Sequence, residues 1–277
     1  MRALNKKVLI TLSLTISTAA VAEIQHIDDA MLAGITGQSG ITIEIDTKIH
    51  IGEVIYTDTA SGALGDIGGG GISAQNISIQ GANKTSFFGS NIWGVVPSDR
   101  LNNIKVTVDL NTGGDLVINM GPAEYFGVIA FQVGMEKVQL LGTSAPSTLL
   151  SDLSIVGLAG AGSVIVGADD NVINIVTSLA IDDLDVNADF LSLGLKDVQV
   201  TGASFDIDAP QQLRAFFELD FKVYNAITAQ RDALAIDVNK LEIDVRIGAI
   251  ELAGNSIGSV FIDDLNISNV HLEIYGH

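Results

Sequence analysis

Apolar and polar residues alternate with a period of two along much of this chain. The clearest example is a set of isoleucines at every second position, Ile41, Ile43 and Ile45, with polar residues between them. The same alternation recurs over residues 106–110, 204–208, 234–238, 241–247 and 270–275. Successive side chains of a strand point to opposite faces, so this pattern predicts half-buried β-strands. Gly, Asn, Asp or Pro bound each segment, as expected at strand ends.

Other local patterns predict short connecting elements. Residues 28–34 predict a short N-terminal helix, because Asp28 can cap its first turn and Gly34 can end it. Two glycine-rich stretches, Gly62–Gly71 and Gly157–Gly167, predict turns and loops. Strands therefore dominate, and the expected class is all-β.

Weak internal repeats leave two all-β architectures open. The segment 131–142 resembles the segment 191–202, and Ile181–Val186 resembles Ile262–Ile267. Such units suit the stacked coils of an elongated β-solenoid-like fold. They also suit a β-sandwich of short strands in which Val, Ile, Gly and Asp recur by composition alone.

The first residues have the features of a cleaved secretory signal peptide. Three basic residues precede an apolar stretch that ends in Ala20-Val21-Ala22, a small-residue cleavage site. The expected organisation is a signal peptide over residues 1–22, an N-terminal motif segment over 23–40 and a single β-rich domain over 41–277. We expect an exported protein, extracellular or at the outer cell surface, with the periplasm as a further possibility. No transmembrane span is expected in the mature chain.

Composition narrows the classes of partner. The chain carries 14 Lys and Arg against 33 Asp and Glu, a formal net charge of −19. Nucleic acid is therefore not an expected partner, because phosphate backbones repel so acidic a chain. Hydrophobic residues make up 47% and charged residues 17%, which predicts a folded chain. There is no Cys, which excludes disulfides, thiolate metal sites and cysteine nucleophiles.

No motif for catalysis is present in the sequence. The four histidines do not form a metalloprotease motif, and no nucleophile elbow or phosphate-binding loop occurs. We therefore expect no catalytic residues, no enzyme activity and no cofactor apart from the calcium considered next.

Clustered acids raise the alternative of a calcium site. The candidate ligands are Asp182, Asp183, Asp185, Asp263 and Asp264. Closely spaced carboxylates suit Ca²⁺, but no calcium-loop motif surrounds these residues. The favoured interpretation is that they form the polar faces of strands and keep the protein soluble.

Two segments resemble a known family. The run Leu32-Ala33-Gly34-Ile35-Thr36-Gly37-Gln38-Ser39-Gly40-Ile41 resembles the L-x-x-[VI]-T-G-Q-x-G motif that opens the FilA-like family of pilus-system proteins of Gram-negative bacteria. The C-terminal Ile257-Gly258-Ser259-Val260, followed by Leu265 and the ending Ile274-Tyr275-Gly276-His277, is similar to the ends of such chains. The resemblance implies a cell-surface or filament-associated role and no catalytic residue.

The strand beginning at Ile41 offers a mechanism for such a role. Ile41, Ile43 and Ile45 could add as an extra strand to a neighbouring subunit, with the Thr36-Gly37-Gln38 turn setting the entry of that strand. The simpler interpretation is that this strand pairs within its own chain.

The expected function is therefore a secreted, non-catalytic subunit or accessory of an extracellular filament, pilus or adhesin system. Its expected partners are further copies of itself or other surface proteins. The alternative is a monomeric secreted ligand- or carbohydrate-binding β module, with calcium dependence left open. A carbohydrate-active enzyme ranks third.

Overall fold

The structure is a computed structural model of the chain. It describes residues 40–58, 69–92, 94–124, 127–142, 145–206, 214–227 and 232–275. Residues from Gly40 onward form one compact unit. The expected signal peptide and the expected helix at residues 28–34 lie outside the described residues.

The described residues are almost entirely β-strand, which confirms the all-β class. The strands are β1 (Ile41–Thr47), β2 (Ile49–Thr57), β3 (Gly71–Gly81), β4 (Ser86–Phe87), β5 (Ser90–Asn91), β6 (Leu101–Leu110), β7 (Leu116–Pro122), β8 (Ile129–Leu141), β9 (Ser147–Val166), β10 (Ile173–Ala188), β11 (Leu193–Gly202), β12 (Phe217–Ile227), β13 (Asp232–Leu252) and β14 (Asn255–Ile274). One 3₁₀ turn, η1 (Asp189–Leu191), lies between β10 and β11. Within the described residues, no helix has the length and apolar character needed to cross a membrane.

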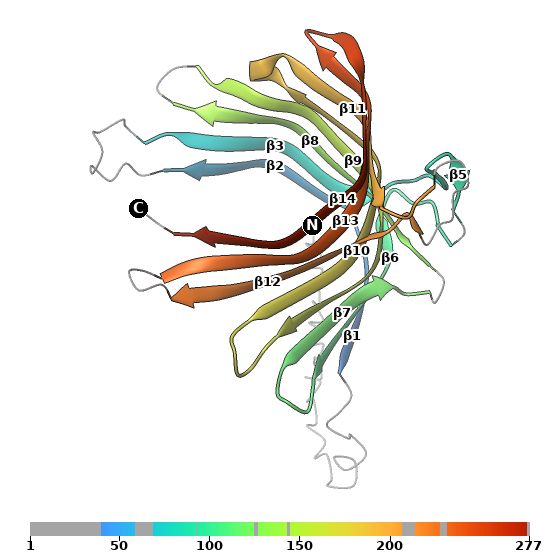
Figure 1. The fold of residues 1–277 in the computed structure, drawn as a ribbon, viewed down its shortest axis with the longest axis vertical. Helices are drawn as coiled ribbons and strands as arrows, with labels where there is room; N and C mark the ends of the chain where they lie inside the picture. The colour runs from blue at the N-terminus through green and yellow to red at the C-terminus, as the bar shows by residue number, and fades with distance from the viewer. Residues whose placement is uncertain are drawn as a thin grey trace, which may run out of the picture. The chain divides into compact units, whose positions relative to one another are not determined.

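Within the described residues, twelve strands form one antiparallel sheet with two tiers. The first tier has the order β2-β3-β8-β9-β10-β11-β13-β14, and the second has the order β1-β6-β7-β9-β10-β12-β13-β14. The long strands β9, β10, β13 and β14 run through both tiers, while the shorter strands belong to one tier each. Figure 1 shows the two tiers diverging toward the left from the region beside β5.

The sheet order explains what the internal repeats are. The segment 131–142 lies mostly in β8 and the segment 191–202 mostly in β11. Three antiparallel steps separate these strands, so the two repeats run in opposite directions. Stacked solenoid coils would run in the same direction. The repeats are therefore similar strands of one continuous sheet.

The second glycine-rich stretch lies in a strand, so the prediction of a loop there was wrong. Residues 157–166 belong to β9 at the point where this strand passes from one tier to the other. A Cβ on Gly157 would lie 2.5 Å from the Ala180 carbonyl oxygen and 2.9 Å from Cζ of Phe131. Glycine is needed here because neighbouring strands approach closely, and not because the chain turns.

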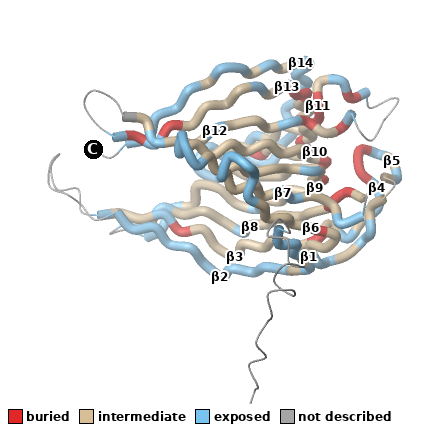
Figure 2. The backbone as a smooth tube through the Cα atoms, turned by 90° about the horizontal axis from the view of Figure 1, so that it is seen from below, coloured by how far each residue is buried: buried red, intermediate tan, exposed pale blue. Residues whose placement is uncertain are grey.

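The main buried cluster lies beside this tier change. It comprises Phe87, Phe88, Val128, Leu158, Ala180, Phe205 and Ala215. Phe88 and Phe205 meet edge to face with ring centroids 5.3 Å apart. Leu158 and Ala180 belong to β9 and β10, while the phenylalanines come from the β4–β5 hairpin and the segment after β11. The hairpin and this segment thus pack on one side of the sheet where its tiers meet (Figure 2).

A partly buried ion pair fastens Lys84, which precedes the β4–β5 hairpin, to β10. Nζ of Lys84 lies 2.6 Å from Oδ2 of Asp182, whose side chain is only 9% exposed. Oδ1 of Asp182 accepts a hydrogen bond from the backbone N–H of Phe88. Lys84 also lies over the ring of Phe87, with Nζ 4.8 Å from the ring centroid. One carboxylate thus holds both the hairpin, at Phe88, and the residue Lys84 that precedes it.

Candidate functional site

The side of the sheet opposite the buried cluster is apolar in both tiers. Residues paired across antiparallel strands share a face, so the register identifies its members. One row across the second tier is Ile41, Val108, Ile118, Val164, Ile175, Phe221, Val238 and Val270. A row in the first tier is Phe131, Gly157, Ile181, Val200, Val245 and Ile262. We call this side the apolar face. It comprises the two rows and the other residues of each strand that point to the same side.

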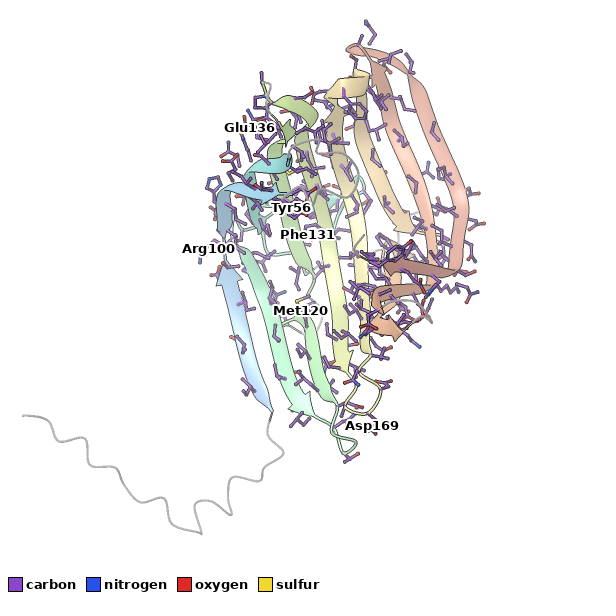
Figure 3. The ribbon with its side chains drawn as sticks, turned by 90° about the vertical axis from the view of Figure 1, so that its left-hand side faces the viewer. Tyr56, Arg100, Met120, Phe131, Glu136 and Asp169 are labelled. Carbon is purple, nitrogen blue, oxygen red and sulfur yellow. The ribbon has the colours of Figure 1, made fainter. Side chains whose placement is uncertain are left out.

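Much of the apolar face is in contact with solvent. Ile41 is 63% exposed, Met120 43% and Ile274 56%, and these residues come from opposite edges and the interior of the sheet. Figure 3 labels Met120 and Phe131, one residue from each tier. Eight strands spaced about 4.8 Å apart make the face roughly 38 Å wide. Lone soluble proteins seldom expose contiguous apolar patches larger than a few hundred Å², so exposed apolar residues at both edges and in the interior of a face this wide mark it as an interaction surface.

The sheet also ends in two open edges. Among the described residues, β1 pairs only with β6 and β2 only with β3, while β14 pairs only with β13. Figure 2 places β2 and β14 at opposite ends of the sheet. Each edge strand therefore presents one unused row of backbone N–H and C=O groups, which can template another strand.

The predicted assembly strand is one of these edges. Ile41, Ile43 and Ile45 lie in β1, opposite Val108, Val106 and Ile104 of β6. The strand thus pairs within its own chain on one side and is open on the other. The isoleucines lie on the apolar face, and Ile43 is 46% exposed. Thr36, Gly37 and Gln38 lie outside the described residues.

The candidate calcium ligands separate into two groups, each with a member that the sequence did not single out. Asp183 and Asp185 of β10 meet Asp197 of β11, and Asp263 and Asp264 of β14 meet Asp244 of β13. Within each group, ligand atoms lie within 4.8 Å of one another. Asp182 belongs to neither group, because its carboxylate pairs with Lys84. The register across strands, which sequence spacing does not reveal, selects Asp197 and Asp244.

Both acidic groups are built on the same backbone feature. Asp197 and Asp264 adopt left-handed conformations, with φ of 51° and 52°. Each lies where the ladder is irregular, and its N–H donates to a carboxylate on the neighbouring strand. The acceptors are Oδ1 of Asp185 and Oδ1 of Asp244, both at 2.9 Å. Asp tolerates the left-handed region better than most residues, so both bulges suit this residue type.

Asp183 carries an unfavourable charge in the first group. Burial raises the pKa of its carboxyl, and the nearby Asp185 and Asp197 raise this pKa further. Its Oδ1 atom is buried without a hydrogen-bond partner in the structure. A carboxyl with a raised pKa favours folding below its unfolded pKa of 3.8, and this contribution is lost as pH rises through the folded pKa. At neutral pH the Asp183 carboxylate therefore opposes folding.

His271, in the edge strand β14, contacts two carboxylates. Nδ1 of His271 in β14 lies 2.6 Å from Oδ1 of Asp237 in β13, and Nε2 lies 3.3 Å from Oε1 of Glu273. Hydrogen bonds to Asp237 and Glu273 raise the pKa of His271 above its ordinary 6.5. Hydrogen bonds from His271 and Tyr224 lower the pKa of Asp237 below its ordinary 3.8. Lys222 lowers it further through its charge.

The pair predicts a definite pH dependence. His271 stabilises the fold fully below pH 6.5, and that contribution is lost as pH rises through its raised pKa. Asp237 stabilises the fold fully above pH 3.8, and that contribution is lost as pH falls through its lowered pKa. Both contributions are therefore complete between these values. An NMR titration should place the His271 pKa above 6.5, and Asp237→Asn should lower it. An unchanged His271 pKa in that variant would contradict the pairing.

The N-terminal part of the chain is similar to a known protein family. Residues 1–112 match a family of unknown function (DUF6160). This region reaches from the N-terminus through β1, the predicted assembly strand, to the end of β6. No curated protein and no solved structure matches the chain.

Proposed function

We propose that this chain is an exported, non-catalytic protein of the Gram-negative cell surface, a subunit or accessory of an extracellular filament, pilus or adhesin system. The observation that carries the proposal is the exposed apolar face, bounded by two open edges. Burial of apolar surface stabilises proteins by about 25 cal/mol per Å², so a face of this size strongly favours association. The resemblance of the N-terminal motif and the C-terminal segment to the FilA-like family supports the same role.

The proposal predicts that the full chain associates through this face and its edges. Light scattering should give a particle mass well above that of one chain, and negative-stain electron microscopy should show ordered filaments. Ile43→Asp should abolish these assemblies, because it places a charge on the apolar face in an open edge strand. Circular dichroism checks that the variant remains folded.

Phe190→Asp is the matched control. Phe190 is 62% exposed and lies in the 3₁₀ turn η1, outside the strands that form the apolar face and its edges. The same change of charge there should leave assembly largely intact. Unchanged filaments in a folded Ile43→Asp variant would exclude β1 from assembly. A chain that stays monomeric under all conditions would overturn the proposed function.

The second candidate is a secreted ligand-binding β module that uses calcium. The two acidic groups favour it, because each gathers three carboxylates within reach of one cation. A bound ion would also offset the repulsion that raises the Asp183 pKa.

Asp183→Asn tests this candidate by thermal unfolding. Without calcium, the variant should melt about 1–3 °C above the parent at pH 7, because it removes a carboxylate that opposes folding. This difference should vanish near pH 3, where the carboxyl is protonated. If calcium binds there, it should raise the Tm of the parent and not that of the variant. Asp169→Asn, at an exposed position in a turn, is the control for net charge. A parent Tm that does not respond to calcium would reject the candidate.

A further inference from the structure

The two open edges belong to opposite ends of one sheet and match each other. We propose that the partner of each edge is a second copy of this chain, with β14 of one copy pairing with β1 and β2 of the next. This inference rests on the proposed function and specifies its interface. The contact is head to tail, so each added copy leaves one edge of each kind open. Such association produces open-ended filaments.

Strand direction supports the pairing. In the part of the chain that the structure describes, each tier contains eight strands, and every neighbouring pair is antiparallel. The first and eighth strands therefore run in opposite directions. When copies repeat in the same orientation, β14 meets β1 and β2 as an antiparallel neighbour in both tiers. An odd number of strands would have forced a parallel junction in an otherwise antiparallel sheet.

The two edges pass from one tier to the other after the same number of residues. β1 belongs to the second tier and has 7 residues, and β2 continues from it into the first tier. The part of β14 in the second tier is Ser268–Ile274, which pairs with residues 234–240 of β13. This stretch is as long as β1. Its remainder, Asn255–Ile267, follows the first tier and exceeds the 9 residues of β2. One edge can therefore follow the bend of the other.

When the second-tier ends of β1 in one copy and β14 in the next are aligned, apolar side chains lie opposite apolar side chains. With Ile41 opposite Ile274, Ile43 lies opposite Leu272 and Ile45 opposite Val270. All these residues are on the apolar face, which then continues from one copy to the next. On the other face the same alignment places Glu44 opposite His271. A shift by one residue would set isoleucines against Glu273 and His271, so the side-chain pattern excludes odd shifts and the aligned ends of the two strands fix the register.

Cysteine cross-linking tests the junction, because the natural chain contains no Cys. Opposite residues in an antiparallel pair have Cα atoms about 4.5–5.5 Å apart, within the range that a disulfide spans. We would make Ile43→Cys, Leu272→Cys, the double variant and the control Leu110→Cys in the full chain. Each is oxidised after assembly and run on a non-reducing gel. Light scattering before oxidation records whether the variant assembles.

The expected result is specific to the mixture of variants. Ile43→Cys mixed with Leu272→Cys should give a cross-linked dimer, while either variant alone should stay at the Leu110→Cys background. The double variant should give a ladder of multimers. A dimer from one single variant alone would overturn the head-to-tail arrangement, and so would a monomer closed on itself in the double variant. Assemblies without the mixed cross-link would overturn this inference and leave the proposed function standing. Failure to assemble would overturn both.

Discussion

Leu158→Ala should destabilise the fold by about 2–5 kcal/mol, the range found when a fully buried leucine is truncated. Leu158 is 0% exposed and lies where β9 passes between the tiers. It packs in the cluster with Phe87, Phe88 and Ala180. The cavity left by truncation should remain open, because the backbone of β9 is held by strands on both sides. Denaturant unfolding measures the loss.

Leu110→Ala is the control for this prediction. Its side chain is 74% exposed, so the same truncation should cost less than about 1 kcal/mol. If Leu158→Ala lowered the free energy of unfolding as little as Leu110→Ala does, the cluster beneath the β4–β5 hairpin would contribute little to stability. A large loss at Leu158 alone would identify the tier change as the core of the domain.

Asp182→Ala should cost about 1.5–3 kcal/mol, because it removes a charged acceptor from a buried donor. The backbone N–H of Phe88 would lose its partner, and Lys84 would lose its ion pair. Lys84 is 37% exposed, so water compensates part of the second loss. The β4–β5 hairpin should then detach more readily from β10. Hydrogen exchange at Phe88 should rise together with the loss of stability.

Asp99→Ala provides the matched control. Asp99 also pairs with a lysine, Lys48, at 3.2 Å, but its side chain is 64% exposed. Exposed ion pairs usually contribute less than about 1 kcal/mol, so this variant should unfold almost as the parent does. Asp182→Asn should fall between the two, because its amide oxygen can still accept from Phe88. An Asp182→Ala variant as stable as Asp99→Ala would show that the hairpin is held by apolar packing alone.

Alternation along the chain predicted the strands and their faces with good success. The isoleucines of β1 and the alternating residues of β13 and β14 lie in strands as expected. Alternation failed at residues 204–206, which follow β11 and are not in a strand, while residues 207–208 lie outside the described residues. The loop prediction also failed over residues 157–166, where glycine in β9 signals a close approach of strands and not a turn. A glycine has the same sequence signature in both cases, so only the neighbouring strand distinguishes them.

At the candidate sites too, the sequence identified residues that are close along the chain and missed those that strand pairing brings close. Carboxylate spacing brought Asp183 and Asp185 to attention, but Asp182 next to them faces Lys84, 98 positions earlier. Asp197 and Asp244 were missed because the register of neighbouring strands, and not sequence proximity, brings them to the acidic groups. The apolar face was missed as a site because strand alternation predicts an apolar side without saying what covers it.

The sequence by itself determined the all-β class, the acidic character and the two-faced strands, because these depend on composition and on a side-chain period of two residues. Only the tertiary structure decided that β1 and β2 form one edge of the sheet and β14 the other. It also decided that each tier has eight strands among the described residues and that part of the apolar face is exposed. These properties depend on pairings between distant segments, whose partners and register arise from packing across the whole sheet.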